Sequence, residues 1–208
     1  MNGRLGRWAA AGAAAMALLA IGLAPGAHAQ AGDPAAAQIA AFDDALLATM
    51  KDAKSLGVEG RYHKLEPAVA RAFDAGTMIR FAVGPGWSTI PAAQQAALTT
   101  AFERLTVAGY AKNFSGYSGE TFVVQPNVVT RGPDKLVTTV VSSKGQSVTI
   151  AYRMREIGGS WKIIDVFYNG SISQLTTRRS DFAAAFAQGG AAGLLAHLNA
   201  LADKDLKG

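Results

Sequence analysis

The apolar residues of this chain change their spacing twice, and this change limits the possible folds more than any other feature. From residue 34 to residue 114 they recur at helical spacing, as Ile39 and Phe42 illustrate. From residue 121 to residue 168 they follow the shorter period of β-strands, and after residue 170 the spacing is helical again. The pattern predicts an α+β fold in which helices from both ends of the chain cover a sheet formed by its middle.

We expect a first helix from Pro34, capped by Asp33, to Gly57 and a second with Pro67 in its first turn. The long helix after Pro91 should lie against the sheet.

Four apolar, β-rich runs make up this middle region: 122–128, 136–141, 148–154 and 161–168. Short turns rich in Gly, Pro and polar residues separate them, at 131–134, 144–146 and 158–159. Because connections this short join neighbouring strands antiparallel, we predict a four-stranded antiparallel sheet with one face covered by helices. The last run, Trp161–Tyr168, is apolar on both faces and is therefore predicted to be a central strand.

The first 29 residues are typical of a secretory signal peptide. Arg4 and Arg7 precede an uncharged run from Ala9 to Leu23, and the small residues of Ala27-His28-Ala29 follow. The run has 15 residues, fewer than the roughly 20 that a helix needs to cross a bilayer. We therefore expect cleavage after Ala29, with an uncleaved anchor as the alternative, and one domain over residues 30–208.

Composition argues against several functional classes. The chain has no Cys, so disulfides, thiol catalysis and thiolate metal sites are excluded. Beyond the leader only His63 and His197 remain, without the spacing of a zinc site, and we expect no metal and no cofactor. Without Arg4 and Arg7 there are 18 basic against 15 acidic residues, not clustered as a nucleic-acid groove requires.

The stretch from residue 161 to residue 198 carries a family resemblance. The strand is closed by Asn169-Gly170 and followed by Arg178-Arg179-Ser180-Asp181-Phe182, Gly189-Gly190 and Gly193-Leu194-Leu195. This order and spacing resemble the MlaC-type periplasmic phospholipid-binding proteins, also called the toluene-tolerance family. The resemblance extends upstream to Phe73-Asp74, Met78, Gly84, Trp87, the helix around Phe102 and Tyr110, and Gly116-Tyr117.

Membership of this family would imply a lipid carrier and not an enzyme. The resemblance implies an apolar cavity between sheet and helices, in which acyl chains lie, and a periplasmic location. It also implies transfer of a phospholipid between an inner-membrane ABC transporter complex and an outer-membrane lipoprotein or porin complex. The run 73–78 and the aromatic helix ending near Tyr110 are similar to the branch associated with hopanoid biosynthesis, often called HpnM, so a hopanoid is a second candidate cargo.

The candidate lipid-binding residues come from the strand alternation, the apolar helix face and the family resemblance. They are Phe73, Met78, Trp87, Phe102, Leu105, Tyr110, Val148, Ile150, Tyr152, Met154, Ile164 and Val166. The adjacent Arg178 and Arg179 are our candidates for steering the carrier onto an acidic membrane complex. Alternatively, these arginines cover the sheet edge or pair with Asp181.

Asp165 suggests a rival function. A carboxylate buried in an apolar strand could act as a general base together with Tyr152 or Tyr168, as in a small cone-shaped enzyme of the nuclear-transport-factor-like fold, of isomerase or hydrolase type. The structural alternative is that Asp165 faces the outside of the sheet and bonds Arg153 or Arg155. A third class, an interaction module with a dry core, also stays open.

Overall fold

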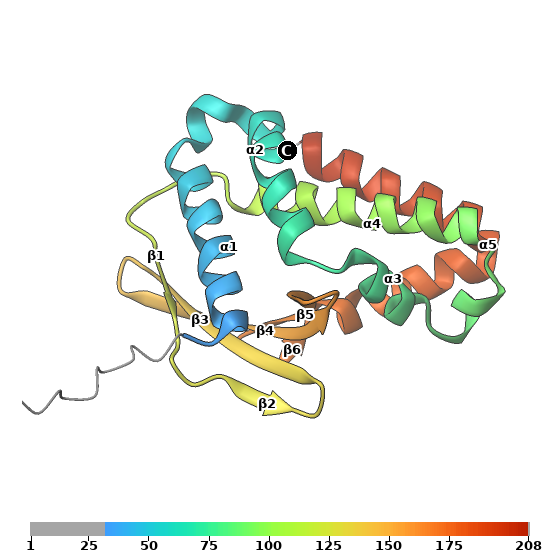
Figure 1. Cartoon of the computed structure of the whole chain (residues 1–208). Helices are drawn as coiled ribbons and strands as arrows, with labels where there is room; N and C mark the ends of the chain where they lie inside the picture. Colours follow the sequence, from blue (N-terminus) through green and yellow to red (C-terminus); the bar gives the residue numbers. More distant parts are fainter. Residues whose placement is uncertain (1–31, 208) are drawn as a thin grey trace, which may run out of the picture. The chain divides into compact units, whose positions relative to one another are not determined.

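The computed structural model describes residues 32–207, in which a helical first half, a strand-rich middle and a final long helix follow one another as the hydrophobic period predicts (Figure 1). The expected signal peptide, residues 1–29, lies outside the described residues. The helical elements are α1 (Pro34–Lys51), α2 (Ala53–Ala72), α3 (Ala75–Val83), the 3-10 helix η1 (Gly84–Thr89), α4 (Ala92–Asn113) and α5 (Gln174–Lys207). The strands are β1 (Thr121–Val124), β2 (Val129–Arg131), β3 (Asp134–Ser143), β4 (Gln146–Ile157), β5 (Ser160–Tyr168) and β6 (Ile172–Ser173).

The sheet is antiparallel throughout, with the strand order β1-β3-β4-β5-β6 and with β2 also paired to β3. The predicted α+β class and the antiparallel meander are confirmed, but the predicted number of four strands is wrong. Inside the predicted run 122–128, β1 ends at Val124, and a separate strand β2 begins only at Val129, because Pro126 lies between them and has no N–H for the ladder. The two-residue β6 was not predicted.

The first two helices differ in their bounds from the prediction. Asp33 caps α1 as expected, since its carboxylate accepts from the backbone N–H of Ala35 at 2.8 Å. The predicted stop at Gly57 is wrong: α1 ends at Lys51, and Gly57 takes a positive φ of 62° inside α2, where it makes a kink. Pro67, expected in a first turn, consequently lies well inside α2.

The core lies between the helices and one face of the sheet, and Phe42 of α1 is at its centre. Its ring meets those of Phe73, Tyr110 and Tyr152 edge-on, at centroid distances of 5.3, 5.2 and 6.4 Å. These residues come from the end of α2, from α4 and from β4, so one aromatic cluster joins three helical segments to the sheet.

Candidate functional site

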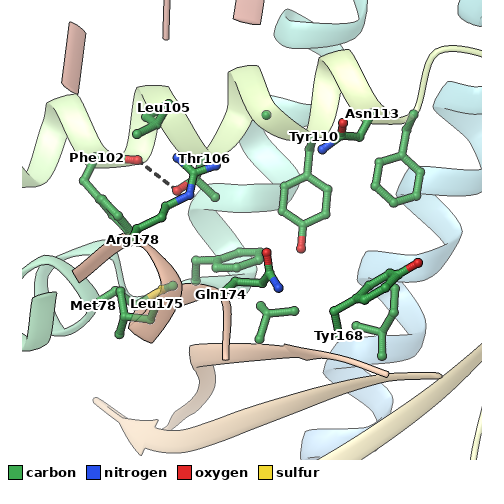
Figure 2. Close-up of a pocket in the computed structure, with 15 residues that line it drawn as sticks. Met78, Phe102, Leu105, Thr106, Tyr110, Asn113, Tyr168, Gln174, Leu175 and Arg178 are labelled. Atoms are coloured by element: carbon green, nitrogen blue, oxygen red, sulfur yellow. Dashed lines mark hydrogen bonds between the residues drawn. The ribbon is translucent and has the colours of Figure 1, made fainter. Parts of the chain in front are cut away.

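A cavity of about 340 Å³ lies between α4, the strands β4 and β5, and the start of α5 (Figure 2). Such a volume falls within the range of small-molecule sites. The side chains that line it are Phe73, Met78, Phe102, Leu105, Thr106, Gly109, Tyr110, Asn113, Phe114, Ile150, Val166, Tyr168, Gln174, Leu175 and Arg178.

The cavity lies on the side of α4 that faces the sheet, because α4 packs on other helices and not on the strands. We expected α4 to lie against the sheet, but it packs on α2, α3 and α5 and makes only sparse contacts with the strands. Arg61 of α2 donates to the carbonyl of Ala111 at 2.7 Å. Lys112 forms an ion pair with Asp205 of α5 at 2.8 Å. These bonds fix α4 to its helical neighbours, and a gap is left on the sheet side.

The walls of the cavity are apolar and aromatic, as burial of a hydrocarbon chain requires. One helical stripe of α4 supplies Phe102, Leu105, Thr106, Gly109, Tyr110 and Asn113. On the opposite wall, Ile150 of β4 pairs with Tyr168 of β5. Figure 2 shows Tyr110 projecting from α4 toward the strands.

Behind the aromatic cluster lies a buried polar group that the sequence did not single out. The carboxylate of Asp43 accepts a hydrogen bond from Thr139 at 2.7 Å and a longer one from the Tyr152 hydroxyl at 3.5 Å. Burial raises the pKa of Asp43 to about 7, and it also raises the pKa of the Tyr110 hydroxyl. Tyr110, which lines the cavity, therefore keeps a neutral hydroxyl, whereas Asp43, which does not line it, is neutral only below about pH 7.

The mouth of the cavity differs from its interior because its side chains are polar. Gln174 and Arg178 come from the first turns of α5, and Asn113 comes from the end of α4. Both α5 residues are exposed, and among the described lining residues Arg178 is the one that carries a charge. The site thus combines an apolar interior with a polar rim.

Asp165 holds the start of α5 and does not line the cavity. Its carboxylate accepts from the Ser173 hydroxyl at 2.7 Å and from the Leu175 N–H at 3.4 Å. The expectation that Asp165 bonds Arg153 or Arg155 is wrong, since both arginines form ion pairs with Asp134. Asp165 therefore positions the helix that carries Leu175 into the cavity wall.

Tyr152 and Tyr168 are not gathered around Asp165 as a group that could exchange protons with a ligand. Tyr152 is fully buried in the core and bonds Asp43, whereas Tyr168 is exposed at the mouth of the cavity. In the sheet register, Tyr152 is paired with Val166, while Asp165 is opposite Arg153. The expected pairing of the basic residues with Asp181 is also absent, because Asp181 bonds His197 at 2.7 Å.

The structure brings seven of the twelve predicted lipid-binding residues to the cavity: Phe73, Met78, Phe102, Leu105, Tyr110, Ile150 and Val166. It places the other five elsewhere: Trp87, Val148, Tyr152, Met154 and Ile164. Tyr152 and Met154 follow Ile150 in the strand alternation but are fully buried in the core. Ile164 is buried where the register between β4 and β5 shifts, and this irregularity interrupts the alternation of β5. Trp87, in η1, packs on the core.

Eight lining residues were missed as ligand contacts, and four of them carried a signal. Continuing the helical stripe from Phe102 and Leu105 predicts Thr106, Gly109 and Asn113. Continuing the alternation of β5 beyond Val166 predicts Tyr168. Phe114, Gln174, Leu175 and Arg178 had no such signal, because nothing in the periodicity shows how the ends of α4 and α5 meet the strands.

Within residues 32–207, no helix combines the length and the apolar character that a membrane span requires. In the same residues, side chains of the metal-ligating types do not gather in groups of three or more.

Comparisons with known proteins place this geometry in context. The model of a family described as MlaC protein matches residues 40–200. No curated protein sequence matches significantly. Among solved structures, a phospholipid-binding protein from Ralstonia solanacearum, determined in complex with a phospholipid, is similar in fold with a TM-score of 0.72. It is 22% identical in sequence, and the alignment covers 83% of this chain and 99% of the other.

Proposed function

Because this chain belongs to the MlaC protein family, we propose that it is a lipid carrier that binds a phospholipid by its tails. The observation that carries the proposal is the apolar cavity between α4 and the sheet, open at a polar mouth. Burial of each methylene contributes about 0.8 kcal/mol, so a few buried segments of an acyl chain already give appreciable affinity. The headgroup then stays at the mouth, in contact with water.

The protein is proposed to bind and release its ligand, not to convert it. Asp165, the rival candidate for a general base, is occupied by Ser173 and by the start of α5. The ionisable side chains that line the cavity are Tyr110, Tyr168 and Arg178, which suit hydrogen bonding and anion binding better than proton abstraction at neutral pH. A carrier needs only this combination of an apolar interior and a polar rim.

The proposed setting is the periplasm, where the carrier would move lipid between an inner-membrane ABC transporter complex and an outer-membrane lipoprotein or porin complex. Residues 1–29, with the features of a signal peptide, support export. Lipid tails leave a buried site slowly through water, so transfer requires docking. Of the basic pair, Arg179 is exposed, does not line the cavity and stays our candidate for docking on an acidic surface.

Two measurements test the proposal. Native mass spectrometry of the protein isolated from the periplasm should show a co-purified lipid, and its mass distinguishes a phospholipid from a hopanoid. In a second assay, the delipidated protein is titrated with a fluorescent phospholipid. Ile150→Glu places a charge in the cavity wall and should abolish binding, with the secondary structure retained in circular dichroism.

The matched control is Val123→Glu, on a strand position that is 53% exposed and lies outside the cavity. It should bind as the wild type does. If Ile150→Glu fails to fold, Ile150→Trp fills the cavity without adding a charge and should weaken binding in the same way. Equal binding by the wild type and by a folded Ile150 variant would contradict the proposed site.

A further inference from the structure

The side chain of Arg178 joins the apolar wall of the cavity to its mouth. Arg178 lies three residues after Leu175 and four after Gln174, so all three share one face of α5. Leu175 is buried in the wall, whereas Arg178 is exposed. An arginine at this place can lay its aliphatic stem along apolar surface and keep the guanidinium at the rim. In Figure 2 the side chain of Arg178 extends from α5 toward α4.

The N–H donors of the Arg178 guanidinium are available to a ligand. Among the described residues, no carboxylate lies within 4 Å of it, whereas Arg104, Arg153 and Arg155 each have an acidic partner. The nearest carboxylate in sequence, Asp181, bonds His197. The lining itself contains no acidic residue that would repel an anion.

The backbone at the start of α5 does not compete with Arg178 for an anion. The Leu175 N–H donates to Asp165, and the Thr176 N–H donates to the Ser173 hydroxyl at 2.9 Å. These two backbone N–H groups, which a helix start leaves without an intrahelical partner, are therefore already bonded within the protein. The neutral donors that remain at the rim are the side-chain amides of Gln174 and Asn113 and the hydroxyl of Tyr168.

We propose that Arg178 binds the phosphate of the lipid headgroup at the cavity mouth, so that the site prefers a phospholipid over a neutral lipid with the same tails. This inference rests on the proposed lipid-carrier function. Arginine suits the role because its planar fork donates two parallel hydrogen bonds to a phosphate. A neutral polycyclic lipid offers no such partner, and the same contact therefore discriminates between the two candidate cargoes.

The test compares two probes with identical acyl chains, a phosphatidylglycerol and a diacylglycerol, each displacing a fluorescent lipid from the delipidated protein. Arg178→Gln should weaken displacement by the phosphatidylglycerol about tenfold, because one charge-assisted hydrogen bond at a partly exposed site is lost. Displacement by the diacylglycerol should be unchanged. Arg179→Gln removes the same charge one residue away, outside the cavity lining, and should change neither probe. Arg178→Lys should retain part of the preference.

Several results would overturn the assignment of Arg178. An equal loss for both probes in Arg178→Gln would indicate that the side chain only packs against the tails. An equal effect of Arg179→Gln would indicate general electrostatic attraction. Inorganic phosphate that displaced the lipid as strongly as phosphatidylglycerol would assign the site to a free anion. If the wild type bound neither lipid, the proposed carrier function itself would fail, whatever the variants did.

Discussion

The buried carboxylate of Asp43 should make the stability of this protein depend on pH in the opposite sense to a surface ion pair. Asp43 is 3% exposed, and hydrogen bonds from Thr139 and Tyr152 are its polar contacts among the described residues. Burial raises its pKa from 3.8 to about 7. The carboxyl group therefore keeps its proton in the folded state at pH values where the unfolded chain has already released it.

The size of the effect follows from the difference between the two pKa values. Each unit corresponds to about 1.4 kcal/mol, so a shift from 3.8 to about 7 sets an upper limit of about 4 kcal/mol. This contribution is fully present below pH 4 and is lost as the pH rises from about 4 to about 7. Above pH 7 both states are ionised, and the contribution to the slope vanishes.

Asp43→Asn removes the titration and conserves the shape of the side chain. The amide oxygen can still accept from Thr139, and the amide nitrogen can donate to the oxygen of Tyr152. At pH 8 the variant should be more stable than the wild type by about 2–4 kcal/mol, and this difference should disappear near pH 4. The assay is urea denaturation followed by circular dichroism between pH 4 and pH 8.

The control is Asp44→Asn, which removes a carboxylate from the next, exposed position of the same helix. Its stability curve should run parallel to that of the wild type. Parallel curves for the wild type and Asp43→Asn would refute the reasoning, because they would mean that Asp43 is ionised in the folded protein. A lower stability of Asp43→Asn at pH 8 would refute it as well.

Two further substitutions test how the sheet and α5 are stabilised. Asp134 is buried and accepts hydrogen bonds from Arg153 and Arg155, so Asp134→Ala should lower the free energy of unfolding by about 1–3 kcal/mol in urea denaturation. Gly190 takes φ 59° and ψ −154° inside α5, a conformation that side chains disfavour. Gly190→Ala should therefore cost about 1–3 kcal/mol of stability and lower the melting temperature. Gly189→Ala should not, because φ is not positive at Gly189.

The fold could be predicted well because its class depends on local patterns. The change from helical to strand period at Thr121 gave the α+β class, and short turns gave the antiparallel order. Pro126 could have given the division between β1 and β2, because its missing N–H interrupts any strand drawn through it. The kink at Gly57 could not be distinguished from a helix end, since a glycine at positive φ serves both.

The candidate site was harder to predict because periodicity gives the face of an element and not its neighbour. Ile150, Tyr152 and Met154 share one face of β4, and the first lines the cavity while the other two are buried in the core. The difference arises from which helix lies above each residue, and no pattern within the strand encodes it. The same limit explains Asp165, whose partners belong to the next two elements of the chain.

The stretch that carried the family resemblance, residues 161–198, also supplies Tyr168, Gln174 and Arg178 at the mouth of the cavity, and the family match confirms the family assignment. Val166 and Tyr168 lie at the end of β5, and Leu175 and Arg178 lie at the start of α5. Between them the chain has only a short turn and β6, and Asp165 fixes their relative position by its bond to the Leu175 N–H. Strand, turn and helix must therefore keep their order and spacing if the apolar wall and the charged rim are to meet, which is why a sequence pattern could report on this cavity.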